Sequence, residues 1–164
     1  MKKNRIAIVD EDDNIIGYKE RGTLDPEDIY RVSALWLTNS KGEILIAQRS
    51  FNKDHNPGQW GTSVAGTVDE GESYEENIIK EAEEEIGLKG VEFKEGPHGL
   101  NRGEHNYFYQ WYLATVDMDI EDFEIDKEEV EAIRWISKEQ LLKEIKESPE
   151  DFLITMDEWI RDFS

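Results

Sequence analysis

Three glutamates, Glu81, Glu84 and Glu85, are spaced so that they could hold a metal ion. In an α-helix, their i, i+3, i+4 spacing places all three carboxylates on one face. Like charges at this spacing repel one another, and no lysine is interleaved on that face to relieve the repulsion. Carboxylate ligands of this kind favour Mg²⁺, Mn²⁺ or Ca²⁺ over zinc. The plain alternative is an acidic surface helix in a chain whose formal net charge is −20.

The residues around these glutamates predict the helix that would carry them. Ser73 is a good N-cap, and Glu76 three residues later completes a capping box. No helix breaker interrupts residues 73–86, and Gly87 is placed to end the helix. Its core-facing residues are predicted to be Ile78, Ile79, Ala82 and Ile86. The residues predicted to point toward water are Glu76, Lys80 and Glu83.

The stretch 66–88 resembles the Nudix box, a pattern of glycines, glutamates and one arginine at fixed spacing. The matching positions are Gly66, Glu72, Lys80, Glu81, Ala82, Glu84, Glu85, Gly87 and Leu88. All of them fit if Ala82 counts as the aliphatic residue, except Lys80, where the family has arginine. A match of this length is specific enough to favour the metal site over an ordinary acidic surface.

The resemblance implies a fold and a chemistry. The fold is an α/β/α sandwich on a mixed β-sheet, and the activity is cleavage of a phosphoanhydride bond in a nucleoside diphosphate linked to another moiety. In the family, the residues matching Glu81, Glu84 and Glu85 bind the metal ion, here expected to be Mg²⁺ or Mn²⁺. The carbonyl of the glycine matching Gly66 often joins them, and Glu72 is expected to orient the loop and residue 80.

Lys80 makes the box of this chain unusual. An arginine holds carboxylates with a planar fork, whereas a lysine is a flexible point charge that cannot do this bidentately. We expect Lys80 to preserve the charge but to loosen the orientation of Glu72 or Glu84. Reduced activity, raised again by Lys80→Arg, is the corresponding expectation.

The identity of the general base stays open at this point. Glu84 or Glu85 could act through a metal-bound water. Downstream glutamates serve in some family members, which makes Glu128 and Glu129 candidates, although an ordinary acidic loop is the plainer interpretation. Glu104, just before a long aromatic stretch, is a further candidate.

Basic residues are scarce, so Arg49 and Lys53 are candidates to bind the phosphates of a substrate. Solvated surface charges are the alternative. Of the three histidines, His55 is the best candidate for a substrate contact. The segment 48–60 also resembles the matching loop of isopentenyl-diphosphate isomerases, a Nudix branch in which the residues matching Arg49 and Lys53 hold the diphosphate. That isomerisation requires a cysteine where this chain has Ala65.

Three functions are therefore compared. The first is a metal-dependent Nudix hydrolase. The second is a non-catalytic Nudix domain that binds a nucleotide as a sensor, which the lysine in the box favours slightly. The third, an isopentenyl-diphosphate isomerase, conflicts with Ala65 and with the absence of cysteine from the whole chain. The favoured function is the hydrolase, acting on a small-molecule phosphoanhydride.

Composition limits the remaining possibilities. The chain has 164 residues, which suits a single domain over 1–164, and 37% of them are hydrophobic. A net charge of −20 disfavours binding to nucleic acid and to anionic membranes. No signal peptide or membrane span is evident, so a cytoplasmic location is expected. A monomer and a homodimer are not distinguished.

The rest of the chain predicts an α/β domain around this helix. Alternation and turn residues predict strands at 4–10, 15–18, 32–38, 43–49, 60–65, 91–95, 105–116 and 130–136. Loops are expected at 50–58, 96–103 and 117–129. Ser137 with Gln140 predicts a helix over 138–147, and Ser148 with Pro149 predicts a last helix over 150–163.

Overall fold

The fold is built on a mixed β-sheet with β3 at its centre. The computed structural model describes residues 5–163, apart from the side chains of Asp157 and Asp162. Within that range the sheet consists of β1 Arg5–Val9, β2 Ile15–Glu20, β3 Ile29–Thr38, β4 Ile44–Arg49, β5 Trp60–Thr62, β6 Val64–Thr67, β7 Lys94–Asn101, β8 Asn106–Thr115 and β9 Val130–Ile136. Strand β3 pairs antiparallel with β1, β4 and β6 and parallel with β8. The predicted mixed sheet is confirmed.

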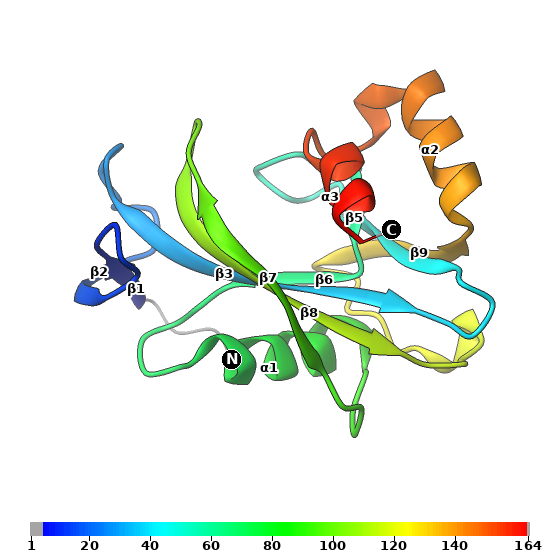
Figure 1. Cartoon of the computed structure of the whole chain (residues 1–164), viewed down its shortest axis with the longest axis horizontal. Coiled ribbons are helices and arrows are strands. Elements are labelled where there is room, and N and C mark those ends of the chain that lie inside the picture. Colours follow the sequence, from blue (N-terminus) through cyan, green and yellow to red (C-terminus); the bar gives the residue numbers. More distant parts are fainter. Residues whose placement is uncertain (1–4, 164) are drawn as a thin grey trace.

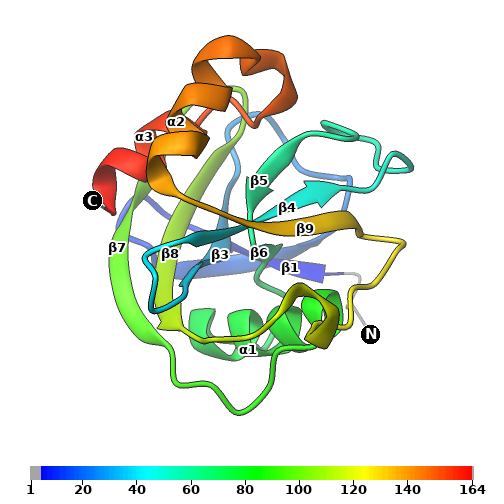
Figure 2. The same ribbon diagram turned by 90° about the vertical axis from the view of Figure 1, so that its right-hand side faces the viewer.

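Helices cover both faces of this sheet. Helix α1 (Tyr74–Ile86) lies on one face, and α2 (Lys138–Glu147) and α3 (Met156–Asp162) lie on the other (Figures 1 and 2). Two short 3₁₀ turns, Ile120–Asp122 and Pro149–Asp151, complete the elements. The predicted α/β/α sandwich is therefore confirmed. None of the helices in the described range is both long and apolar enough to cross a membrane.

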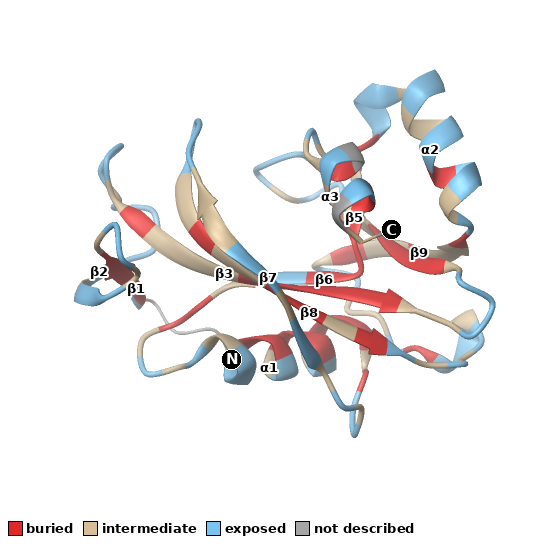
Figure 3. Ribbon diagram, viewed as in Figure 1, coloured by how far each residue is buried: buried red, intermediate tan, exposed pale blue. Residues whose placement is uncertain are grey.

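Two apolar clusters hold the layers together, and Figure 3 shows the buried residues concentrated along the central strands and the inner side of α1. The cluster under α1 packs Ile78, Ala82 and Ile86 against residues of β3 and β4 such as Leu35 and Leu45. The cluster on the opposite face consists of Ala34, Trp36, Ile44, Ile46, Trp111, Ile136, Leu141, Phe152, Met156 and Ile160.

Helix α1 begins and ends as predicted, but its buried stripe is shifted. The capping box of Ser73 and Glu76 is present, and Gly87 ends the helix with φ 69°. The prediction for Ile79 is wrong, because this side chain is 49% exposed. The positions that turn inward beside Ile78, Ala82 and Ile86 are Asn77, Glu81 and Glu85. Two carboxylates thus occupy part of the stripe that an ordinary amphipathic helix would fill with apolar residues.

Two strand predictions need correction. The stretch 60–65 is divided at Ser63, because β5 pairs with β4 whereas β6 pairs with β3. The predicted loop 96–103 is wrong over most of its length, since β7 extends to Asn101 and pairs with β8. Pro97 lies at a register shift between Glu95 and His98, where a missing N–H does not break the ladder.

The last helix is shorter than the predicted 150–163. Helix α3 starts only at Met156, whereas α2 has the predicted limits. Between them the chain is extended at Phe152, which forms an isolated β-bridge with Trp60. The N–H of Leu153 donates to the carbonyl of Trp60 at 2.9 Å. This sheet-like contact competes with helix formation and brings the C-terminal segment beside β5.

Candidate active site

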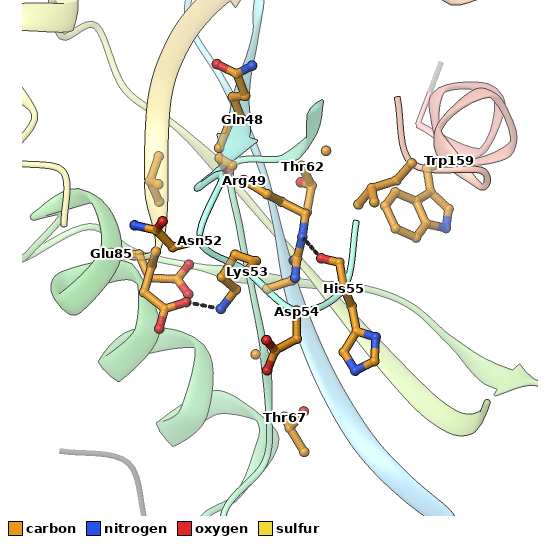
Figure 4. Close-up of a pocket in the computed structure, with 18 of the residues that line it drawn as sticks. Gln48, Arg49, Asn52, Lys53, Asp54, His55, Thr62, Thr67, Glu85 and Trp159 are labelled. Carbon is orange, nitrogen blue, oxygen red and sulfur yellow. Dashed lines mark hydrogen bonds and ion pairs between the residues drawn. The ribbon is translucent and has the colours of Figure 1, made fainter. Parts of the chain in front are cut away.

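A cleft of about 490 Å³ collects residues from widely separated parts of the chain (Figure 4). Its walls are formed by the end of β4, the loop 50–58, strands β5 and β6, the end of α1, the start of β9 and the C-terminal segment. The predicted site residues that line the cleft are Arg49, Lys53, His55, Gly66, Glu85 and Glu129. The fold therefore brings the proposed phosphate-binding residues to the same cavity as part of the acidic helix.

The loop 50–58 is held in shape by its own backbone. The N–H of Gly58 donates to the carbonyl of Arg49 at 3.0 Å, which closes the loop at its base. The Nε of Arg49 donates to the carbonyl of His55, also at 3.0 Å. Lys53 forms an ion pair with Glu129 across the cleft, and both side chains are about a quarter exposed. The end of β4 and the loop thus present one cation each to the cavity.

Glu129 is placed by contacts with α1 and with the loop. The N–H of Asp126 donates to the carbonyl of Glu85 at 2.9 Å, in the last turn of α1 where carbonyls lack helical partners. The N–H of Ser50 donates to the carbonyl of Glu129 at 3.1 Å. These bonds fix the end of the acidic loop beside the helix, so the carboxylate of Glu129 faces the same cavity as that of Glu85.

The other two downstream candidates for the general base lie elsewhere. Glu128 is exposed, and its N–H donates to the side chain of Asp126 at 3.0 Å. Glu104 is exposed in the turn between β7 and β8. Neither of them lines the cleft. Of the downstream glutamates, the structure brings Glu129 to the candidate site.

Gly66 lines the cleft and is in direct contact with Glu81, whereas Glu81 and Glu84 do not themselves line the cleft. The side chain of Glu81 is 0% exposed, and a Cβ atom added at Gly66 would lie 2.7 Å from its Cγ. The glycine therefore leaves the space that the Glu81 carboxylate occupies. Glu85 is 8% exposed and Glu84 is half-buried. Buried carboxylates beside a backbone carbonyl are a donor set that suits a hard divalent cation.

The candidate ligands are not gathered in advance around one point. Among the residues that the structure describes, no three His, Asp or Glu side chains form a group that could hold a metal ion as arranged. Glu81, Glu84 and Glu85 still project from adjacent turns of one helix, and carboxylate rotamers are adjustable. If these residues hold a metal ion, their side chains would have to rotate toward one another.

The C-terminal segment adds an apolar wall that sequence reasoning did not assign to the site. Leu153 and Trp159 both line the cleft. Trp159 also packs edge-on against Trp111, with ring centroids 4.9 Å apart, so its side chain contacts both the core and the cleft. Ala65 is exposed in the cleft, at the position where an isomerase would need its cysteine. No local signal marks Trp159, because its place depends on how α3 docks.

Comparison with known families decides the identity. A model of the NUDIX domain matches residues 29–157. The chain belongs to the Nudix family. An uncharacterized Nudix hydrolase of Yersinia pestis is 29% identical over 156 residues, covering 94% of this chain and 85% of that protein. An uncharacterized Nudix hydrolase of Listeria monocytogenes is 32% identical over 122 residues, covering 72% of this chain and 69% of that protein. These relatives confirm the predicted class of enzyme, a Nudix hydrolase.

Solved structures agree with this family assignment. The crystal structure of DR0079 from Deinococcus radiodurans superposes with a TM-score of 0.83 at 26% identity, covering 96% of this chain and 97% of that one. An Ap4A hydrolase of C. elegans superposes with a TM-score of 0.61 at 19% identity, covering 82% and 94% of the two chains. The second likeness supports the Nudix fold alone.

Within the Nudix box, the structure shows a buried ion-pair network that the sequence did not reveal. The side chain of Asp69 is fully buried and pairs with both Arg21 and Lys80. Lys80 also reaches Glu72 at 2.6 Å, so its predicted direction toward water is wrong. Glu72 accepts hydrogen bonds from the N–H of Asp69 at 2.9 Å and from the side chain of Asn77 at 3.1 Å. The Arg21–Asp69 contact spans 48 positions, so no spacing rule would have found it.

This network sets the protonation of its members. Burial favours the neutral form of Asp69, but hydrogen bonding to Lys80 and the charge of Arg21 outweigh it and hold its pKa below the ordinary value. Burial likewise opposes the charge of Lys80, yet its bonds to Asp69 and Glu72 raise its pKa above the ordinary value. Asp69 and Lys80 are therefore both charged at neutral pH.

Proposed function

We propose that this Nudix hydrolase is a metal-dependent pyrophosphohydrolase that cleaves a phosphoanhydride bond of a nucleoside diphosphate linked to another moiety. One observation carries the proposal. The cleft has two cations on one side, Arg49 at the end of β4 and Lys53 in the loop 50–58, and the carboxylate end of the box helix on the other. In a chain of net charge −20, paired cations facing carboxylates suit a phosphorylated substrate bound together with a metal ion.

Each residue then has a defined task. Arg49 and Lys53 bind substrate phosphates, and His55 contacts the substrate at the rim of the cleft. The ligands of a Mg²⁺ or Mn²⁺ ion are Glu81, Glu84, Glu85 and the carbonyl of Gly66. When bound, the ion neutralises phosphate charge and lowers the pKa of an attacking water.

The Lys53–Glu129 ion pair suggests which residue removes a proton from that water. A phosphate that binds Lys53 competes with Glu129 for the same ammonium group. Glu129 would then turn from an ion-pair partner into a proton acceptor at the centre of the cleft. Glu84 and Glu85 are the alternative bases. Leu153 and Trp159 offer an apolar surface to the nucleobase or to the second moiety of the substrate.

Two other functions are less well supported. A nucleotide sensor would need the same cleft but no turnover, and the lysine in the box is the feature that favours it. An isopentenyl-diphosphate isomerase would need a thiol where Ala65 presents a methyl group to the cleft. The resemblance of segment 48–60 to the isomerase-like branch therefore supports diphosphate binding by Arg49 and Lys53 more than isomerisation.

A substrate panel tests the proposal. Nucleoside diphosphate derivatives would be incubated with the full chain in Mg²⁺, Mn²⁺ or excess EDTA, and release of nucleoside monophosphate or phosphate would be measured. We expect turnover only with a divalent ion. Glu85→Gln should abolish it, whereas Glu83→Gln, an exposed residue of the same helix, should retain it. Tight ligand binding without turnover would favour the sensor, and conversion of isopentenyl diphosphate would favour the isomerase.

A further inference from the structure

Arg21 lies in the turn that follows β2, and its side chain reaches the loop of the Nudix box. The turn is closed by Thr23, whose backbone N–H and hydroxyl both donate to the carbonyl of Glu20, at 3.2 and 2.7 Å. The β1–β2 hairpin is also tied to the box loop, because the N–H of Glu70 donates to the carbonyl of Arg5 at 2.9 Å. The hairpin thus places the guanidinium group of Arg21, which lies outside the box sequence, beside the loop of the box.

Asp69 is the residue that forms an ion pair with the guanidinium group of Arg21. One carboxylate oxygen pairs with Arg21, and the other accepts from Nζ of Lys80 at 2.8 Å. Lys80 also forms an ion pair with Glu72 at 2.6 Å, and Glu72 accepts a hydrogen bond from the backbone N–H of Asp69 at 2.9 Å. These contacts link two cations and two anions in one continuous network. A buried carboxylate such as Asp69 is stabilised only when partners of this kind are retained.

The chemistry of lysine explains why a second cation is needed. The ammonium group of Lys80 makes one contact with each of Asp69 and Glu72, and it has no planar fork with which to fix either carboxylate. A single ammonium contact leaves a carboxylate free to rotate about it. Arg21 engages the second oxygen of Asp69 and so removes this freedom.

We propose that Arg21 is a positioning residue that replaces the guanidinium missing from position 80 of the box. It fixes Asp69, and through Asp69 it orients Lys80, Glu72 and the loop that joins β6 to α1. The proposal rests on the function proposed above, because the orientation matters for the carboxylates of α1 and the ion they bind. It also explains how a box with lysine at position 80 can stay organised.

A direct role of Arg21 in substrate binding is the competing explanation. Its side chain is 35% exposed and it also lines the cleft. The two explanations differ in one respect. A positioning residue can be replaced by an arginine elsewhere in the network, whereas a phosphate contact at the position of Arg21 cannot be supplied from position 80.

The test uses the full-length protein with Arg21→Gln, Lys80→Arg and both changes together. Arg5→Gln is the matched control, since Arg5 is an exposed cation of the same hairpin whose side chain pairs with Glu70 outside the network. For each protein, kcat and KM on the panel substrate, the Kd for Mn²⁺ and the urea midpoint of unfolding would be measured.

We expect Arg21→Gln to lower kcat or weaken Mn²⁺ binding by about 10-fold, the usual effect of removing a group that orients metal ligands. Lys80→Arg should restore most of this loss in the Arg21→Gln background. In the wild type, where Arg21 already compensates, it should change activity by less than about twofold, in place of the increase expected from the sequence alone. Arg5→Gln should behave as wild type. An increase in KM alone, without rescue, would show a substrate contact and overturn the inference. Unchanged kcat and Mn²⁺ affinity in folded Arg21→Gln would overturn it as well.

Failure of the proposed function would look different. In that case the wild type itself would show neither turnover nor Mn²⁺ binding. The unfolding midpoints would then decide the inference, since a coupled network requires the shifts caused by Arg21→Gln and Lys80→Arg to be non-additive. Additive shifts would show that the two cations act independently, and the compensation would be ruled out.

Discussion

Gly66 in the wall of the cleft lies in contact with the buried Glu81, so that the backbone of β6 covers a carboxylate from the middle of α1. The space between them is too small for a methyl group, since a Cβ atom at Gly66 would stand 2.7 Å from Cγ and 2.9 Å from Cδ of Glu81. The glycine of the Nudix box is therefore explained here by close approach. Two elements, a strand and a helix, meet at the residue that would hold the metal ion most deeply.

Gly66→Ala tests this contact. The added methyl group should push Glu81 aside, reduce the affinity for Mn²⁺ and Mg²⁺ and destabilise the fold by about 1–3 kcal/mol, as overpacking usually does. Isothermal titration with Mn²⁺ and urea unfolding would measure the two effects. Gly17→Ala is the control, because nothing lies within 4 Å of a Cβ atom there. Wild-type metal affinity in Gly66→Ala would argue against Glu81 as a ligand.

Glu129 and Glu128 are neighbours in sequence with different surroundings, which makes them a matched pair. If Glu129 is the general base, Glu129→Gln should lower kcat by about 100-fold or more, with Glu128→Gln close to wild type. The acidic limb of the pH profile of kcat should also disappear in Glu129→Gln. If the two variants have equal effects on kcat, Glu129 is not the general base, and Glu84 and Glu85 are the remaining candidates.

The ion pairs of Asp69 predict how stability depends on pH. Its pKa in the folded protein lies below the ordinary 3.8, so its stabilisation is complete above the unfolded pKa and is lost as the pH falls through the folded pKa. At about pH 6, Asp69→Asn should lower the unfolding free energy by at least about 1 kcal/mol, because Arg21 and Lys80 lose a shared anion.

The measurement is urea unfolding of both proteins over a range of pH. The gap between wild type and Asp69→Asn should stay constant down to about pH 5 and close below about pH 4. A difference measurement is needed because the chain has 39 acidic residues and many of them titrate in the same range. A gap that persists or widens in acid would contradict the assignment of a charged, stabilising Asp69.

Trp159 tests the apolar side of the cleft. Stacking of a base on an aromatic side chain contributes about 1–3 kcal/mol, so Trp159→Ala should raise KM for a nucleotide substrate by about 10-fold or more. Trp159→Phe should keep most of the affinity and, by filling the space against Trp111, most of the stability. If KM is unchanged in a folded Trp159→Ala, the cleft does not use this wall for binding.

Local features of the chain were predictable because their signals are local. The capping box of Ser73 and Glu76, the end of α1 at Gly87 and the limits of α2 and β9 all follow from residues a few positions apart. Errors arose where a distant contact overruled the local signal. Pro97 lies within β7 because β8 pairs around it, and the segment before Met156 is extended because Leu153 bonds to Trp60.

By itself, the sequence determined the family and the fold class and predicted the metal-binding carboxylates, because the Nudix box is one contiguous stretch read at helical spacing. Only the tertiary structure decided which downstream glutamate reaches the cleft, that Trp159 lines it and that Arg21 pairs with Asp69. The physical reason is the length of chain between the partners. Contacts that span 48 or 76 residues depend on how strands and loops pack, and no periodicity in the sequence encodes them.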